Sequence, residues 1–549
     1  MDGVPVAWVA STAAELSAAL MFRVGKADEA LYFNGITHLI EHLALFGVGQ
    51  QPHAMNGSVS SAITSFECAG SPDEVIQFFD KLCRSLNALP VERLDAEVRV
   101  LATEHGRRGG VFDEHMYWRY GNSGPGLFSA DEFATRTMTG GHLQGWVQQR
   151  MTAQNAVLVL SGPVPVGLRL QLPQGNRLAV PALTPVPSFF PRWFTTTSGR
   201  VTFSGLVERT PALPALLHTL NDEIVTRLRM QAAIAYSPSV LADSYDGKHA
   251  HMIADADAHP DHAYRAVALM ADMLNDLARG GPSAEQLTRF RTLAGADLDP
   301  VASAHWEARQ HLLCVPHMTA ATHLEQTLAV TAEDVRALAG QLQASALYGM
   351  PQGNRVDDAV AKPVDYGYTG PVFPGTRVEP VVGADAGYEL YAPAGALTIK
   401  VEGGALVSSS YDSAVAVLAW PDGGRRLINR DGTSVMLEPQ LWQDGRRLAA
   451  ELDAATTARQ VPMKPRELED IPRPRPQQQT VLQDVTAAHK RHIRLGGPRS
   501  WKAQAVSATF GCLGLYGLTH QDATTSVAWV STLAIGGWSA FALGWLRRR

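Results

Sequence analysis

The chain has 549 residues, a formal net charge of −6, and 46% hydrophobic and 18% charged residues. This composition is typical of a globular protein of about two to four domains, and the small negative charge excludes a generic nucleic-acid binder. The four cysteines include no CxxC pair and the N-terminus lacks the basic start of a signal peptide, so we expect a reducing compartment without a disulfide framework.

The first predicted domain, residues 1–170, mixes strands and helices. The runs VPVAWVA, SAALMFRVG and NAVLVLSG predict strands, whereas GITHLIEHLALFG and residues 91–108 have the spacing of apolar residues that helices show. A proline-rich linker follows at 171–196 and indicates a domain boundary. Residues 197–348 repeat the order of strands and helices. The sequence therefore predicts an α+β fold built from two related α/β half-units.

Residues 376–457 predict a small β-rich domain. Short strands alternate with glycine turns and are followed by one helix, QLWQDGRRLAAELDAA. This order of elements is similar to that of a pleckstrin-homology domain, and an unrelated β-sandwich is the alternative. Residues 458–502 form a linker that is first rich in proline and then basic.

Two uncharged apolar runs near the C-terminus, 503–518 and 526–546, predict a transmembrane helical hairpin over residues 503–546. Basic residues flank the pair on both outer sides, so both ends and the bulk of the chain are expected in the cytoplasm. The first run is short for a span, and a buried or interfacial helix is its alternative. We therefore expect a protein anchored in a membrane.

The segment HLIEH places His38 and His42 four residues apart, one turn apart on the same face of a helix. Two imidazoles so placed can bind one zinc ion, and Glu41 between them can take a proton from a metal-bound water. The alternative is that polar residues merely share a helix. A zinc site needs a third protein ligand. Glu97 and Glu104, two turns apart on the next predicted helix, are candidates, and His105 is a rival that points about a quarter-turn away.

These residues resemble the pitrilysin/insulinase zinc peptidases, which carry an HxxEH motif and include mitochondrial processing peptidase. The resemblance covers about residues 5–348. It rests on four segments: FRVGKADE, GITHLIEHLALFG, FATRTMTGGHLQGWVQQRMTAQNAVLVLSGPVP and RLRMQAAIAYSPSV, together with the paired glutamates.

The resemblance implies a role for each matching position. His38, His42 and Glu104 would bind Zn²⁺, and Glu41 would be the general base. Glu97 would support the site from outside the ligand shell. Two further residues, Arg229 and Tyr236, would bind the substrate carbonyl and the developing oxyanion.

The resemblance also implies how substrate and subunits meet. A peptide substrate would add as a strand to a sheet edge, for which residues 58–67 are the candidate. A chain with one pair of such half-units would need a second copy or a partner subunit to close a chamber. The leading prediction is thus a membrane-anchored zinc endopeptidase that cuts unfolded peptides or leader sequences. The alternatives are a non-catalytic scaffold of the same fold within a membrane complex, and a zinc ion that only stabilises the fold.

Overall fold

The computed structural model describes residues 1–475, except 11, 12, 14, 51–53, 106–109, 188, 296–298 and 365–369. The chain divides near residue 365 into two compact units. The predicted hairpin at 503–546 and most of the linker before it lie outside the described residues. Within the described part, no helix combines the length and the apolar character that a membrane span requires.

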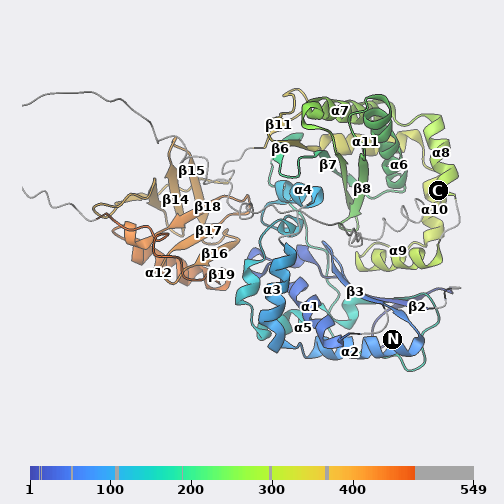
Figure 1. Ribbon diagram of the computed structural model, residues 1–549, viewed down its shortest axis with the longest axis horizontal. Coiled ribbons are helices and arrows are strands. Elements are labelled where there is room, and N and C mark those ends of the chain that lie inside the picture. The colour runs from blue at the N-terminus through green and yellow to red at the C-terminus, as the bar shows by residue number, and fades with distance from the viewer. Residues whose placement is uncertain are drawn as a thin grey trace, which may run out of the picture. The chain divides into compact units, whose positions relative to one another are not determined.

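The first half of unit 1 is a five-stranded sheet with helices on one face (Figure 1). The strands are β1 (Val6–Trp8), β2 (Leu16–Phe22), β3 (Ala54–Val59), β4 (Thr64–Gly70) and β5 (Ala156–Leu160). Their order is β1-β5-β2-β4-β3, so β1 and β3 are the sheet edges. The helices are α1 (Ile36–Val48), α2 (Pro72–Asn87), α3 (Leu94–His105), α4 (Val111–Tyr120) and α5 (Gly140–Arg150).

The second half repeats this topology. Its strands are β6 (Arg192–Thr196), β7 (Val201–Glu208), β8 (Ser239–Ser244), β9 (His249–Ala256), β10 (Leu347–Pro351) and β11 (Lys362–Pro363). Apart from the added β11, the order β6-β10-β7-β9-β8 matches the first sheet strand for strand, with the first and last strands parallel in both. The predicted pair of related α/β half-units is therefore present. The second sheet begins inside the predicted linker, because β6 starts before residue 197.

The helices of the second half are α6 (Leu213–Ile224), α7 (Ala263–Gly280), α8 (Ala284–Ala294), α9 (Pro300–Leu312), α10 (Ala320–Leu328) and α11 (Ala332–Ala344). Most of them pack around a continuous apolar core with the second sheet. A π-helical segment, Val225–Gln231, continues α6.

The two halves interlock by exchanging one helix each. Helix α9 of the second half packs Ala304, Ala308 and Leu312 on the first sheet, as Figure 1 also shows. Helix α4 of the first half packs on the second sheet, where the His115 Nε2 atom lies 2.7 Å from the hydroxyl of Thr202. The exchange is reciprocal, because α4 of the first half packs on the second sheet and α9 of the second half packs on the first. It explains why the two halves form one compact unit.

Unit 2 contains two four-stranded sheets, ordered β12-β13-β14-β15 and β18-β17-β16-β19. The strands are β12 (Thr376–Val378), β13 (Tyr388–Ala392), β14 (Ala396–Val401), β15 (Leu406–Ser410), β16 (Ala416–Ala419), β17 (Arg425–Ile428), β18 (Ser434–Leu437) and β19 (Gln460–Pro462). Helix α12 (Gly445–Thr456) packs Leu452 into the core between them. Strand β19 returns to the second sheet beyond residue 457, and the likeness to a pleckstrin-homology domain stays a prediction.

Candidate metal centre

Helix α1 begins where a glycine and a buried carboxylate together favour a helix start. Gly35 has φ of 94°, and a Cβ there would lie 2.6 Å from the Thr135 side chain. Glu29 accepts the backbone N–H of Gly35 at 2.7 Å and of Thr37 at 3.0 Å. These bonds satisfy amides that have no partner inside the helix, and the negative charge suits the positive end of the helix dipole. Glu29 therefore fixes the turn that carries His38.

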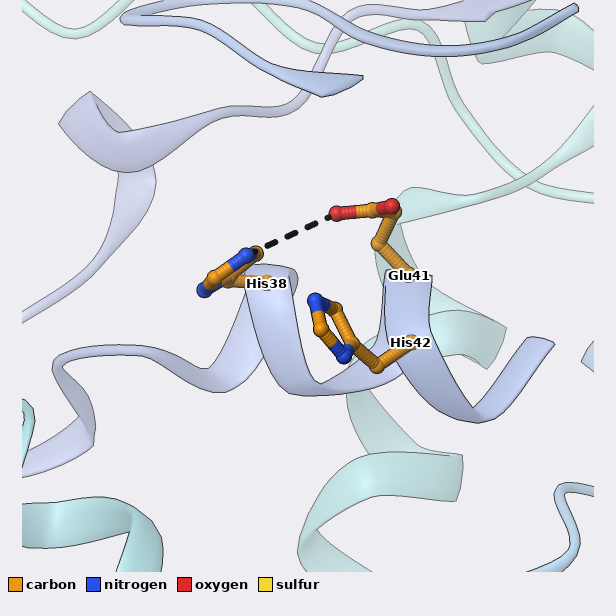
Figure 2. A group of neighbouring side chains, drawn as sticks. All are labelled: His38, Glu41 and His42. Carbon is orange, nitrogen blue, oxygen red and sulfur yellow. Dashed lines mark ion pairs between the residues drawn. The ribbon is translucent and has the colours of Figure 1, made fainter. Parts of the chain in front are cut away.

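His38, Glu41 and His42 lie together on α1, and their ligand atoms are within 4.8 Å of one another (Figure 2). The two imidazole rings are 4.7 Å apart between centroids and nearly perpendicular. The His38 Nε2 atom lies 3.8 Å from a carboxylate oxygen of Glu41. His38 and Glu41 are buried, with 6% and 7% of their surface exposed. A charge on either side chain therefore needs a partner, because burial removes it from water.

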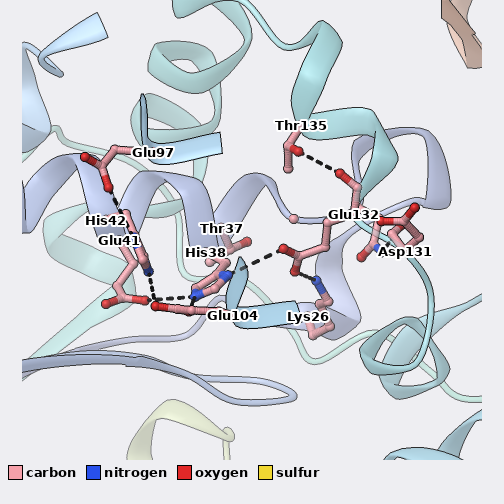
Figure 3. Close-up of polar contacts among 12 residues, drawn as sticks. Lys26, Thr37, His38, Glu41, His42, Glu97, Glu104, Asp131, Glu132 and Thr135 are labelled. Atoms are coloured by element: carbon pink, nitrogen blue, oxygen red, sulfur yellow. Dashed lines mark hydrogen bonds and ion pairs between the residues drawn. The ribbon is translucent and has the colours of Figure 1, made fainter. Parts of the chain in front are cut away.

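Helix α3 packs on α1 and brings Glu104 to both histidines (Figure 3). One carboxylate oxygen of Glu104 lies 3.5 Å from His38 Nε2, and the other lies 3.6 Å from His42 Nε2. Two atoms that bind one tetrahedral zinc ion at its usual bond lengths are about 3.3–3.6 Å apart. Both contacts fall in this range, each through a different carboxylate oxygen of Glu104, so the donor set suits a zinc ion. The rival His105 has its side chain outside the described part of the structure.

The second nitrogen of each histidine faces another carboxylate (Figure 3). His42 Nδ1 lies 3.4 Å from Glu97, and Glu97 in turn contacts Arg93 at 3.3 Å. His38 Nδ1 lies 3.5 Å from Glu132, a residue that precedes α5. Carboxylates in this position fix the tautomer and ring orientation of metal-binding histidines. Both imidazoles are thus held with Nε2 directed at Glu104.

Glu132 belongs to a buried charge pair that the sequence analysis missed. Its carboxylate lies 2.7 Å from the ammonium of Lys26, which also contacts Glu29 at 3.3 Å. Burial raises the pKa of Glu132, but the charge of Lys26 and the contact with His38 outweigh it and hold this pKa well below its ordinary value. No spacing rule links Glu132 to a motif so far upstream. The only signal that could have identified Glu132 is its burial beside a buried base, Lys26.

Strand β3 closes the site on one side. A Cβ added to Gly57 would lie 2.4 Å from a carboxylate oxygen of Glu41, so only glycine leaves that side chain its place. Because β4 pairs with both β2 and β3, β3 is the free edge. The expected edge at residues 58–67 is therefore wrong for most of its length. The sequence shows a hairpin there but does not tell which of its strands is paired on both sides.

Arg229 and Tyr236 form a separate pair in the second half. The guanidinium of Arg229, on the π-helical segment, lies 5.1 Å from the centroid of the Tyr236 ring. This ring is 76% exposed and lies just before β8, the edge strand that corresponds to β3. The structure thus brings the pair together, at the second free edge rather than among the contacts of the histidine cluster described above.

Comparisons with known proteins identify the fold. No family model and no curated protein matches the sequence. Among solved structures, an inactive M16 peptidase domain from Pseudomonas fluorescens is similar over 65% of this chain and 98% of its own, with 14% identity and a TM-score of 0.53. A protease from Helicobacter pylori is similar over 64% and 97%, with 14% identity and a TM-score of 0.53. The periplasmic protease PqqL from Escherichia coli is similar over 74% and 55%, with 14% identity and a TM-score of 0.52. About two thirds of the chain therefore has the pitrilysin-type fold of M16 peptidase domains, a fold shared by an inactive domain.

Proposed function

We propose that the protein is a zinc-dependent endopeptidase that cuts extended, unfolded peptides. The observation that carries this proposal is the contact of the Glu104 carboxylate with Nε2 of both histidines, at 3.5 and 3.6 Å. This contact completes a set of three ligands and leaves Glu41 beside them. Three protein ligands are the number that catalytic zinc sites use, with the fourth position left for water or substrate.

Each residue of the site has a role in this proposal. Zinc, when bound, lowers the pKa of a water ligand towards neutrality and polarises a carbonyl oxygen. Glu41 accepts the proton from the attacking water and passes it to the leaving amine. Glu97 and Glu132 keep the two imidazoles in the tautomer that directs Nε2 at the metal. The backbone of β3 pairs with the peptide and aligns its scissile bond beside Glu41.

The second half supplies the substrate-binding pair in this proposal. The Tyr236 hydroxyl and the Arg229 guanidinium are donors that can bind the carbonyl oxygen on which charge develops. A second copy or a partner subunit would complete the enclosure, and the hairpin at 503–546 would anchor the bulk of the chain at the cytoplasmic face of a membrane. These last two features remain predictions from the sequence.

A non-catalytic scaffold is the second candidate, because one of the similar structures is described as an inactive domain. The two candidates differ in one measurable property. Glu41→Gln should keep zinc at wild-type stoichiometry and abolish the cleavage of a peptide library, since Gln cannot take the proton. Glu92→Gln, an exposed position at the start of the short helix before α3, is the matched control and should cleave normally. Cleavage by Glu41→Gln at the wild-type rate, or none by the zinc-loaded wild type, would refute the peptidase proposal.

A further inference from the structure

The segment that carries Tyr236 has an unusual backbone. It follows the π-helical segment Val225–Gln231, and Ala233 has φ of 53°, which L-residues seldom adopt. Both π-helical turns and such backbone angles are concentrated at functional sites. Ile234 and Ala235 are buried, so the segment is anchored just before it turns Tyr236 out to solvent.

One carboxylate fixes the turn that presents Tyr236. The Oδ1 atom of Asp257, at the end of β9, accepts the backbone N–H groups of Tyr236 at 2.9 Å and Ser237 at 2.8 Å. Its Oδ2 atom accepts the Ser237 hydroxyl at 2.9 Å. Partial burial raises the pKa of Asp257, but these hydrogen bonds outweigh it and lower the pKa below its ordinary value. Asp257 is therefore a charged acceptor at neutral pH.

A second contact holds the same turn from the other side. The guanidinium of Arg200 donates to the backbone oxygen of Ser237 at 3.5 Å and forms an ion pair with Asp255. The backbone at Tyr236 is thus fixed although its ring is largely exposed, with the Arg229 guanidinium over one face. An exposed aromatic side chain on a fixed backbone loses little entropy when a ligand binds, which is the advantage of preorganisation.

We propose that Asp257 is a positioning residue for substrate binding, which presents the Tyr236 side chain to the bound peptide. This inference rests on the proposed peptidase function. Asp257 itself does not touch the peptide. Its effect therefore passes through Tyr236, and this dependence separates a positioning role from a general contribution to stability.

The test is a double-mutant cycle between Asp257→Ala and Tyr236→Phe, measured with one fluorogenic decapeptide chosen because the wild type cleaves it. Loss of the contacts of one hydroxyl or one acceptor costs about three- to tenfold in kcat/KM. We expect Asp257→Ala to lose about tenfold in kcat/KM in the wild-type background and less than twofold in the Tyr236→Phe background. Equal losses in both backgrounds, or no loss in the first, would overturn the inference.

Two further variants keep the test independent of folding. Asp257→Asn retains Oδ1, the acceptor of both backbone N–H groups, so kcat/KM should return to within about twofold of the wild type. Asp272→Ala, at an exposed position of α7, is the matched control, with kcat/KM unchanged. Zinc stoichiometry should be equal in all variants. If Asp257→Asn loses as much as Asp257→Ala, the positioning role is wrong. If the wild type cleaves no peptide, the peptidase proposal fails and this role with it.

Discussion

Glu132 offers a direct test of how the metal centre is held, because its contact with His38 is at Nδ1, the nitrogen that faces away from Glu104. We expect Glu132→Gln to weaken zinc binding. The Glu132 carboxylate lies 3.5 Å from His38 Nδ1, and the residue is 6% exposed, so water cannot replace it. Removing such a carboxylate partner typically weakens metal binding about 10- to 100-fold, which is about 1.4–2.7 kcal/mol.

The same substitution also affects the fold, because Glu132 is the partner of Lys26 at 2.7 Å. Breaking a buried ion pair by removing one partner typically costs about 3–5 kcal/mol. Lys26 keeps Glu29 at 3.3 Å, so we expect the lower end of that range. The double variant Lys26→Met/Glu132→Gln removes both charges of the pair. Its free energy of unfolding should recover in part, because Glu29 then loses its contact with Lys26, while the zinc affinity stays low.

The assay is competition for zinc with a chromogenic chelator, and urea unfolding of the metal-free protein is measured beside it. Lys26→Met alone is the control, because it leaves the carboxylate on His38. A wild-type zinc affinity in both Glu132→Gln and the double variant would show that this carboxylate does not orient His38. A zinc affinity that recovers together with stability in the double variant would refute the reasoning equally, because it would assign the whole effect to folding.

Three further predictions concern other parts of unit 1. Glu104→Ala should abolish stoichiometric zinc binding by the purified protein, measured by metal analysis after dialysis, and zinc retained at one ion per chain would exclude Glu104 as a ligand. Gly57→Ala should lower kcat more than it lowers zinc content, because the added Cβ would displace the Glu41 carboxylate. A normal rate would show that β3 can move to accommodate the Cβ. Burial lowers the pKa of His115 and His251 to about 3, so the unfolded chain binds more protons below about pH 6.5. Unfolding free energy should therefore be highest above pH 6.5 and fall on acidification by up to about 2.7 kcal/mol per pH unit for the two groups together. Urea titrations at pH 7 and pH 5 measure this loss, and equal midpoints would contradict it.

The parts of the site that lie close together in sequence could be predicted, and the parts joined by packing could not. His38, Glu41 and His42 share one helix, so their proximity follows from helix geometry alone. Glu104 was placed only through the family resemblance, because nothing in its own helix distinguishes it from the other acids there. Glu132 lies in an irregular segment, where no periodicity relates a side chain to α1.

The repeated half-unit was visible in the order of elements, whereas the exchange of helices was not. An apolar stripe can show only that a helix packs on something, and it does not identify the sheet. Only the tertiary contacts show that each helix crosses to the other half, as the His115–Thr202 hydrogen bond does for α4. The edge at β3 was missed for a similar reason, since pairing on both sides of β4 depends on β2, a strand from much earlier in the chain.

Among the described residues, the candidate metal centre lies in the first half, and the corresponding helices of the second half carry other side chains. Helix α6 follows the second strand of its half as α1 does, and α8 packs on α6 as α3 packs on α1. Yet α6 carries His218 and Asp222, whose side chains lie 3.3 Å apart, and α8 presents Arg289 to the same Asp222. In the first half, the packing of α3 on α1 brings an acid to two histidines. In the second half, the packing of α8 on α6 brings a cation to an acid. The ion pair with Arg289 satisfies Asp222 without a metal. Among the residues that the structure describes, the second half thus has the fold and the free edge at β8 but not this ligand set. In the proposed peptidase, α1 provides the catalytic residues and the Tyr236 turn binds the substrate, so the two functions are divided between two halves of common architecture.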